Sequence, residues 1–113
     1  MTQQEIQVAD LNGTNGFGVA GSNLLEQLGT SVSILQDFNG DGIDDYLIGA
    51  PNTNRAYLIY GRQGTQSTVD LAQLMASQGV VLRGVNDDFA GSTVRGIGDF
   101  NGDGFDDVAI ALL

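Results

Sequence analysis

Two short acidic segments contain the residue types and the spacing that bind hard cations. The first reads Asp37-Phe-Asn-Gly-Asp-Gly-Ile-Asp-Asp45, and the second reads Asp99-Phe-Asn-Gly-Asp-Gly-Phe-Asp-Asp107. Each places an oxygen-bearing side chain at positions 1, 3, 5 and 9. Calcium takes six to eight oxygen ligands at about 2.3–2.6 Å in a tolerant geometry. A curled loop with oxygens at alternate positions can therefore enclose the ion.

Five residues of each segment are predicted to be ligands. Positions 1, 3, 5 and 9 offer side chains, and position 7 offers its backbone carbonyl, which needs no particular side chain. Glycines at positions 4 and 6 permit the positive φ angles of a tight loop. The sequence predicts two calcium ions per chain, the first bound by Asp37, Asn39, Asp41, Ile43 and Asp45 and the second by Asp99, Asn101, Asp103, Phe105 and Asp107.

The charge of the chain favours the same interpretation. There are 14 acidic residues, four arginines and no lysine, which gives a net charge of −10. Eight of the 14 acidic residues lie in the two segments, where they repel one another until a cation binds. Asp44 and Asp106, at position 8, are expected to point to solvent or to bond the loop backbone. Nucleic acid and anionic membrane surfaces repel a chain of this charge.

Several chemistries lack the residues that they need. The chain has no histidine and no cysteine, which removes the usual general base, the common nucleophilic triads, zinc sites and disulfides. The protein is therefore expected not to be an enzyme. No apolar run approaches the length of about 18 residues that spans a membrane. The first five residues, Met1 to Glu5, show no N-terminal secretion signal.

Other calcium loops and a plain turn are the alternatives. An EF-hand needs a bidentate Glu at position 12 and flanking helices, and dockerin loops also need an acid there. Thrombospondin-type repeats need a further Asp at that position. Position 12 is Ile48 in one loop and Ile110 in the other. An ordinary acidic hairpin turn is disfavoured because two near-identical copies occur at matched positions.

The chain contains an internal repeat. The acidic segments are 62 residues apart, and Gly29 to Val32 matches Gly91 to Val94 at the same spacing. Further upstream, Ile6 to Leu11 matches Val69 to Leu74 at a spacing of 63. The 113-residue chain is therefore expected to form a single unit made of two sequence repeats. The first covers about residues 6–68, and the second, which is incomplete, covers about residues 69–113. A period near 60 suits a four-stranded propeller blade.

Short apolar runs and turn residues predict the elements. Seven strands are expected, and the four that flank the acidic loops are expected to be buried on both faces. Short helices are expected at Asp70 to Ala76, capped by Thr68 or Asp70, and at Val8 to Leu11. The strands are predicted at residues 17–20, 31–35, 46–49, 56–60, 80–82, 93–97 and 108–112.

These motifs resemble the FG-GAP repeat, the blade unit of the integrin α-subunit β-propeller and of related bacterial repeat proteins. Leu28 to Val32 stands for the Phe-Gly element, and Gly49-Ala50-Pro51 matches Gly-Ala-Pro. In the second repeat, Phe89 to Val94 stands for the first element, and Ala111-Leu112-Leu113 replaces the last. The resemblance implies an all-β fold of antiparallel propeller blades, with calcium between the first two strands of each. It also implies extracellular or cell-surface use in adhesion or protein binding.

The number of strands leads to an expectation about assembly. Propellers close with about four to eight blades, whereas the predicted strands form about one and a half to two. Ring closure is therefore expected only by assembly, as a homo-oligomer in which Phe17 to Ala20 of a neighbour partly completes the second blade. A piece of a longer propeller and a strand-swapped dimer are the alternatives. In function, the alternatives to a binding module are a purely structural propeller unit and a non-catalytic accessory part of an extracellular enzyme.

Overall fold

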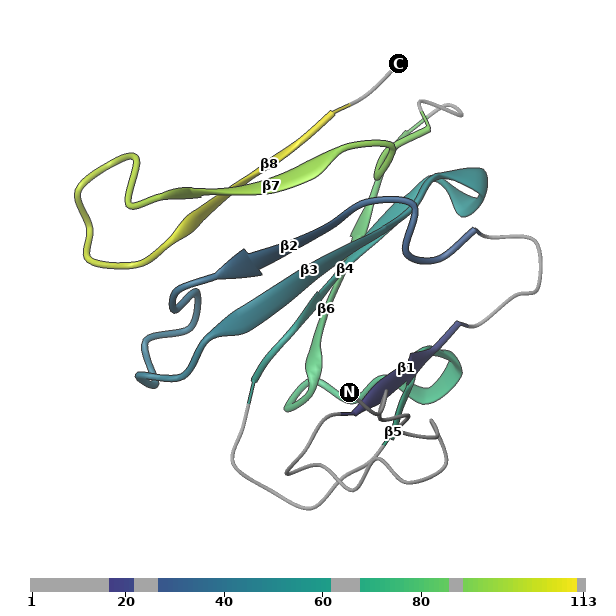
Figure 1. Ribbon diagram of the computed structural model, residues 1–113, viewed down its shortest axis with the longest axis horizontal. Coiled ribbons are helices and arrows are strands. Elements are labelled where there is room, and N and C mark those ends of the chain that lie inside the picture. Colours follow the sequence, from purple (N-terminus) through teal and green to yellow (C-terminus); the bar gives the residue numbers. More distant parts are fainter. Residues whose placement is uncertain (1–16, 22–26, 62–67, 86–88, 112–113) are drawn as a thin grey trace, which may run out of the picture.

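The computed structural model describes residues 17–21, 27–61, 68–85 and 89–111, and these residues form short strands joined by turns (Figure 1). They contain no α-helix, so the all-β prediction is confirmed. Two single 3-10 turns, η2 (Pro51–Thr53) and η3 (Leu71–Gln73), interrupt the loops. The strands are β1 (Gly18–Ala20), β2 (Val32–Leu35), β3 (Asp45–Ala50), β4 (Arg55–Ile59), β5 (Thr68–Asp70), β6 (Gly79–Arg83), β7 (Val94–Gly98) and β8 (Asp107–Ile110).

A four-stranded antiparallel sheet occupies the centre of the molecule, in the order β2-β3-β4-β6. The register pairs Leu35 with Asp45 and Tyr46 with Ile59, which places the first acidic loop at one end of the β2–β3 hairpin. The fourth strand, β6, follows residue 68 and so comes from the second sequence repeat. A blade therefore takes its last strand from the next repeat along the chain.

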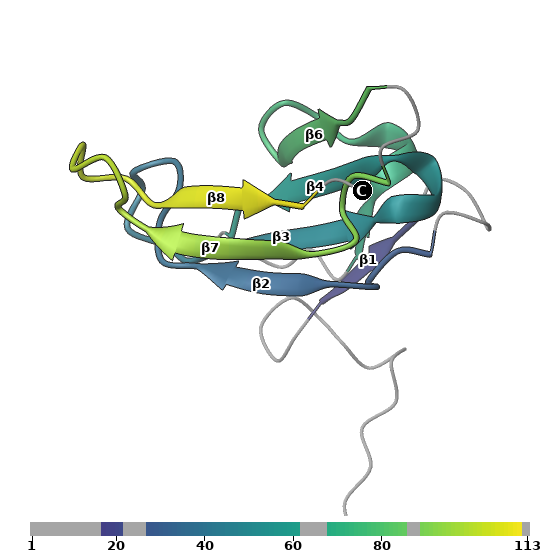
Figure 2. The same ribbon diagram turned by 90° about the horizontal axis from the view of Figure 1, so that it is seen from above.

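The β7–β8 hairpin packs against one face of this sheet (Figure 2). Five buried residues fill the space between them, and half-buried residues including Phe38, Val108 and Ile110 surround them. Gly96 allows the close approach of the two layers, because a Cβ there would lie 2.5 Å from the Leu35 side chain. The buried residues are Leu35, Leu47, Ala56, Leu58 and Val94.

The opposite face of the central sheet carries a second core. Strands β1 and β5 form a parallel two-stranded ladder on this side, next to η3. Phe17 meets Tyr46 edge to face, with ring centroids 5.4 Å apart and planes inclined by 63°. The buried residues here are Ala50, Tyr57, Ile59, Val69 and Leu71. The central strands β3 and β4 are thus covered on both faces, as in a blade inside a propeller.

The burial of the strands departs in part from the prediction. Strand β3 is buried or half-buried throughout, as expected. Strand β2 is not, because Val32 and Ile34 are each 66% exposed. Strand β7 exposes Arg95 and Ile97, and strand β8 exposes Ala109. The reason is that the layer of β1, β5 and η3 packs on β3 and β4 and leaves Val32 and Ile34 uncovered, while the β7–β8 hairpin packs on the central sheet through one face. β2 and β8 each have one face without a covering layer among the described residues.

The predicted helix from Asp70 is replaced by a strand and one 3-10 turn. Strand β5 ends at Asp70, whose side chain caps η3 by accepting a hydrogen bond from the Ala72 N–H at 3.0 Å. The backbone is extended again at Leu74, with ψ at 121°. Burial of Val69 and Leu71 against the central sheet favours the extended path over a longer helix. The expected helix at Val8 to Leu11 lies outside the described residues.

Candidate metal centre

The first acidic loop connects β2 to β3 and is organised by the carboxylate of Asp37. One oxygen of Asp37 accepts the N–H groups of Gly40 at 2.8 Å and Asp41 at 3.1 Å, and the other accepts the N–H of Gly42 at 2.8 Å. Gly40 and Gly42 have φ angles of 81° and 82°, which favour glycine. The loop therefore curls around the side chain at position 1, because its amides turn inward.

Asp45 closes the loop from the other end. It is fully buried at the start of β3. One of its oxygens accepts the N–H of Phe38 at 2.8 Å, and the other accepts the N–H of Gly61 at 2.8 Å. Gly61 lies so close that a Cβ there would be 1.9 Å from the carbonyl oxygen of Asp44. Asp45 thus joins the loop to the end of β4, which gives position 9 a fixed place.

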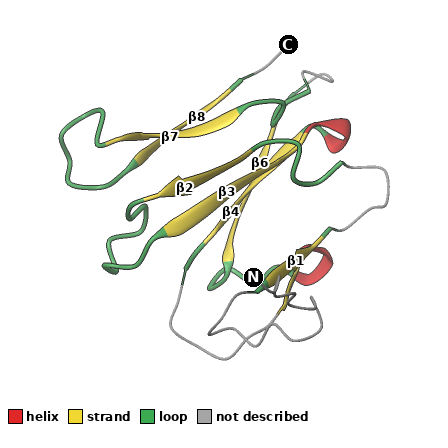
Figure 3. Cartoon of the chain, in the orientation of Figure 1, coloured by secondary structure: helices red, strands yellow, loops and turns green. Residues whose placement is uncertain are grey.

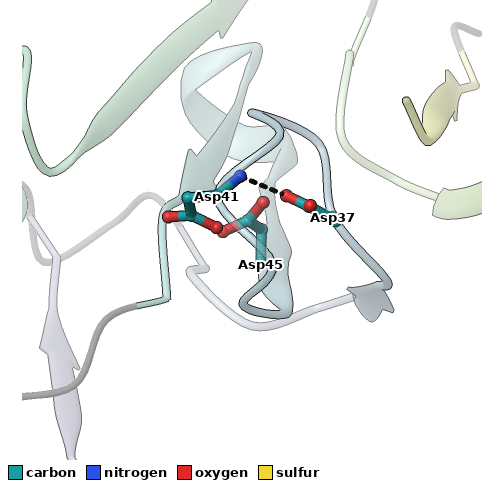
Figure 4. A group of neighbouring side chains, drawn as sticks. All are labelled: Asp37, Asp41 and Asp45. Carbon is teal, nitrogen blue, oxygen red and sulfur yellow. Dashed lines mark hydrogen bonds between the residues drawn. The ribbon is translucent and has the colours of Figure 1, made fainter. Parts of the chain in front are cut away.

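Three carboxylates converge inside this loop (Figure 4). One oxygen each from Asp37, Asp41 and Asp45 can be chosen so that all lie within 4.8 Å of one another. Each ionised carboxylate oxygen has more than one acceptor site, so its bonds to loop amides leave capacity for a cation. All donors are hard oxygens. This set fits a divalent cation such as calcium and offers no soft ligand for zinc or copper.

The second loop, between β7 and β8, repeats the arrangement. Asp99 accepts the N–H groups of Asp103 at 2.9 Å and Gly104 at 2.7 Å, and Asp107 accepts that of Phe100 at 2.7 Å. The carboxylates of Asp99, Asp103 and Asp107 also come within 4.8 Å of one another. Their exposure differs from the first loop, because Asp99 and Asp103 are exposed and Asp107 is half-buried.

The loop amides hold Asp99 in its charged form. Chiefly because the Gly104 N–H donates to its carboxylate, the pKa of Asp99 lies below its ordinary value of 3.8, although desolvation opposes this. The N–H groups of Asp103 and Gly102 act in the same direction. Hydrogen bonds to the ionised form favour that form. Asp99 is therefore an anion at neutral pH and can bind a cation.

The structure brings together six of the ten predicted ligands, the acidic side chains at positions 1, 5 and 9 of both loops. Asn101 turns its side-chain oxygen to the Asp103 N–H at 3.3 Å, inside its loop. Asn39 is exposed. The carbonyl roles of Ile43 and Phe105, like the ligand roles of all ten residues, stay predictions. Sequence reasoning missed one feature: Asp106 reaches across to the first loop.

A sheet of antiparallel strands, stacked face to face on a like hairpin and carrying an acidic loop between its first two strands, defines a propeller-blade repeat (Figure 3). Comparison with known families agrees, because residues 28–68 match the FG-GAP repeat. The chain therefore belongs to the FG-GAP repeat proteins, whose repeats form β-propeller blades. The matched span covers β2, β3 and β4 and the first acidic loop.

Most of the chain is similar to a short part of integrin α subunits. Integrin alpha-2 of Mus musculus is 34% identical over 107 residues, covering 91% of this chain and 8% of the relative. Integrin alpha-5 of Xenopus laevis is 32% identical over 119 residues, covering 91% of this chain and 10% of the relative. Integrin alpha-6 of Homo sapiens is 31% identical and covers 80% of this chain. The chain spans about a tenth or less of the length of these relatives.

Proposed function

We propose that the chain is a calcium-binding β-propeller module that serves adhesion or protein–protein interaction, with calcium in a structural role. The observation that carries this proposal is the pair of carboxylate trios, each gathered within 4.8 Å at the same place in successive hairpins. Six acidic side chains held this close destabilise the chain until a cation offsets their repulsion. Binding of the ion would then add directly to folding stability.

Each ion would be held by five residues of its loop. The carboxylates at positions 1, 5 and 9 would supply charge, the asparagine at position 3 a neutral oxygen, and the carbonyl at position 7 a further oxygen. The ion would neutralise the loop and lock the hairpin end that it closes. The ligands are Asp37, Asn39, Asp41, Ile43 and Asp45 in the first loop and Asp99, Asn101, Asp103, Phe105 and Asp107 in the second.

The role in adhesion or protein interaction rests on the family. The chain is similar to integrin α subunits over 80–91% of its length, and we place it outside the cell or at the cell surface on that ground. No helix among the described residues is long and apolar enough to cross a membrane. The acids that could act in catalysis are committed to metal in this proposal, so the module is not an enzyme. A purely structural propeller unit is the second candidate.

We also propose that blades from several chains stack into a larger assembly. Phe38 and Leu35 are covered by the β7–β8 hairpin, whereas their repeat equivalents Phe100 and Ile97 are 81% and 43% exposed. Val32 is 66% exposed, while its equivalent Val94 is buried between the blades. The two repeats contact each other through opposite faces, so an apolar face of the same kind stays exposed on each repeat. This arrangement favours head-to-tail stacking of chains. A longer propeller chain and a strand-swapped dimer remain the competing arrangements.

Calorimetric titration of the chelator-treated chain with calcium tests the metal proposal. Two ions per chain are expected, with affinity in the range of about 10⁻⁴–10⁻³ M that is usual for extracellular modules. Asp41→Ala should remove one of the two ions, and Asp103→Ala should remove the other. A chain that takes up no calcium at millimolar concentration would contradict the proposal. Magnesium serves as the control, since it demands a near-octahedral site and dehydrates reluctantly.

A further inference from the structure

The two acidic loops are joined by a residue that neither uses as a ligand. Asp106, half-buried in the second loop, accepts a hydrogen bond from the N–H of Gln36 at 2.5 Å through its carboxylate. Its own N–H donates to the carbonyl oxygen of Asp37 at 3.1 Å. Gln36 and Asp37 are the residues through which β2 enters the first loop. Asp106 therefore makes two hydrogen bonds to the start of the neighbouring loop.

A third contact supports this junction. The ring of Phe105 lies against Gly40, since a Cβ on that glycine would be 2.4 Å from the Cε1 atom of the ring. Gly40 is the residue whose N–H the Asp37 carboxylate accepts. Two consecutive residues of the second loop thus fix both the carbonyl of Asp37 and the backbone on which its carboxylate rests.

The position of Asp106 connects this junction to metal binding. It stands between Phe105, whose carbonyl is a proposed ligand, and Asp107, whose carboxylate is another. An ion in the second loop would hold both neighbours and so fix the backbone of Asp106. Asp37, on the other side of the junction, is the proposed first ligand of the first loop. Ordering one loop would therefore lower the cost of ordering the other.

We propose that Asp106 is a positioning residue that couples the two calcium loops, so that calcium in the second raises the affinity of the first. This inference rests on the proposed calcium binding. Because coupling free energies are reciprocal, calcium in the first loop raises the affinity of the second by the same factor. Couplings of this kind amount to about 5-fold to 150-fold in affinity.

The chain contains a matched control in its first repeat. Asp44 stands at the same loop position as Asp106 and carries the same charge. It is exposed, and within the described part of the chain no hydrogen bond joins its carboxylate to another loop. Removing Asp44 changes the net charge as removing Asp106 does, but it leaves the junction between the loops intact.

Calcium titration followed by amide NMR signals of both loops tests the coupling. Gly40 and Gly42 report on the first loop, and Gly102 and Gly104 report on the second. The full chain is compared with Asp103→Ala, which disables the second loop, and with Asp106→Ala and the control Asp44→Ala. Asp106→Asn removes the charge but retains an oxygen that can accept the N–H of Gln36, so it should preserve the coupling. Thermal unfolding in chelator checks that every variant folds.

The expected result is that the first loop of the unaltered chain, of Asp44→Ala and of Asp106→Asn saturates at a calcium concentration at least about 5-fold lower than in Asp103→Ala. In Asp106→Ala, both loops still bind calcium, and the first loop saturates at a calcium concentration above that of the unaltered chain and no higher than in Asp103→Ala, because the Asp106 N–H and the Phe105 ring still contact the first loop. Equal first-loop affinity in all variants overturns the coupling alone. If neither loop of the unaltered chain responds to calcium, the proposed calcium binding is wrong, and the coupling that rests on it is wrong as well. Asp103→Ala leaves Asp106 in place, so this comparison decides whether the loops are coupled even if Asp106→Ala unfolds, and Asp106→Asn against Asp44→Ala then tests the part played by the Asp106 side chain.

Discussion

At the scale of single residues, the buried carboxylate of Asp45 separates a structural role from a metal-binding role. Asp45 is fully buried and accepts the N–H groups of Phe38 and Gly61, whereas Asp41 is exposed and, among the described residues, accepts that of Ile43. Both are proposed ligands of the same ion. Their substitution should therefore have the same consequence for metal and different consequences for the metal-free fold.

We predict that Asp45→Ala destabilises the chelator-treated chain by about 2 kcal/mol or more, because two donors near the core lose their acceptor. Asp41→Ala should cost the metal-free chain less than about 0.5 kcal/mol, as surface substitutions usually do. Urea unfolding in chelator measures both. Equal losses for the two variants would show that Asp45 contributes through metal alone.

The carboxyl of Asp99 predicts a pH dependence. Its pKa is lowered from 3.8, mainly by the Gly104 N–H. A lowered pKa in the folded state means that Asp99 stabilises the metal-free fold above about pH 4 and that this contribution disappears as pH falls through the lowered value. Carboxyl NMR titration in chelator should show a midpoint below 3.8. A midpoint at or above that value would contradict the role given to the loop amides.

At the scale of elements, two serines hold adjacent hairpins together. The hydroxyl of Ser31 accepts the N–H of Val94 at 3.0 Å, and that of Ser33 accepts the N–H of Gly96 at 3.0 Å. These amides lie on β7, which in the described part of the chain is an edge strand paired with β8 alone. The serines therefore satisfy donors that an edge strand would leave free for another chain.

Replacing the serines should loosen the contact between hairpins. Ser31→Ala and Ser33→Ala are each expected to cost about 1 kcal/mol, since each leaves a part-buried N–H without its acceptor. Thr93→Ala is the control, because Thr93 is the repeat equivalent of Ser31 and is exposed. Denaturant unfolding in calcium measures the losses. A control as damaging as the serine variants would refute the assigned role.

A pair of equivalent glycines makes a second comparison between elements. Gly29 and Gly91 both have positive φ, at 89° and 98°. A Cβ on Gly91 would lie 2.3 Å from the carbonyl oxygen of Arg55, while one on Gly29 would meet nothing within 4 Å. Both Ala substitutions incur backbone strain, but only the one at Gly91 also forces β4 and the second repeat apart.

The expected result is that Gly91→Ala destabilises the chain by about 1–3 kcal/mol more than Gly29→Ala, the usual cost of overpacking. Comparison of urea midpoints for the two variants measures this difference. Similar losses would mean that strain alone fixes glycine at both places, and that the close approach at Gly91 relaxes without cost.

The acidic loops were predictable from sequence because local chemistry determines them. The alternation of acids with glycines at positions 4 and 6 specifies a curled loop without help from the rest of the chain, and the structure gathers the carboxylates as expected. The strand that begins at Thr68 and the exposure of Val32 were not predictable. They depend on which layer covers which face, and this follows from packing between segments about 50 residues apart.

At the scale of the whole molecule, the repeat makes the chain a stack with two unlike ends. The central sheet has a layer on each face, but the β7–β8 hairpin has one on only one face among the described residues. Its free face carries Phe100 and Ile97, and the other end of the stack exposes Val32 and Ile34. These two exposed faces are the repeat equivalents of the faces that pack together inside the chain. Contacts between chains would therefore be head to tail and could continue from copy to copy.

We therefore predict that the chain associates in millimolar calcium and that Phe100→Ser weakens this association by 10-fold or more, since burying a Phe side chain is worth about 1.5–3 kcal/mol. Met75→Ser is the control, because Met75 is 59% exposed on the turn before β6 and lies outside the β7–β8 hairpin. Light scattering after gel filtration, over a range of protein concentrations, measures the mass of each variant. Chelation should loosen the assembly, because the loops lie at one end of the hairpins that would stack. A chain that stays monomeric in calcium at every concentration would refute head-to-tail stacking. Equal weakening by both substitutions would show that the contact between chains does not depend on the β7–β8 hairpin.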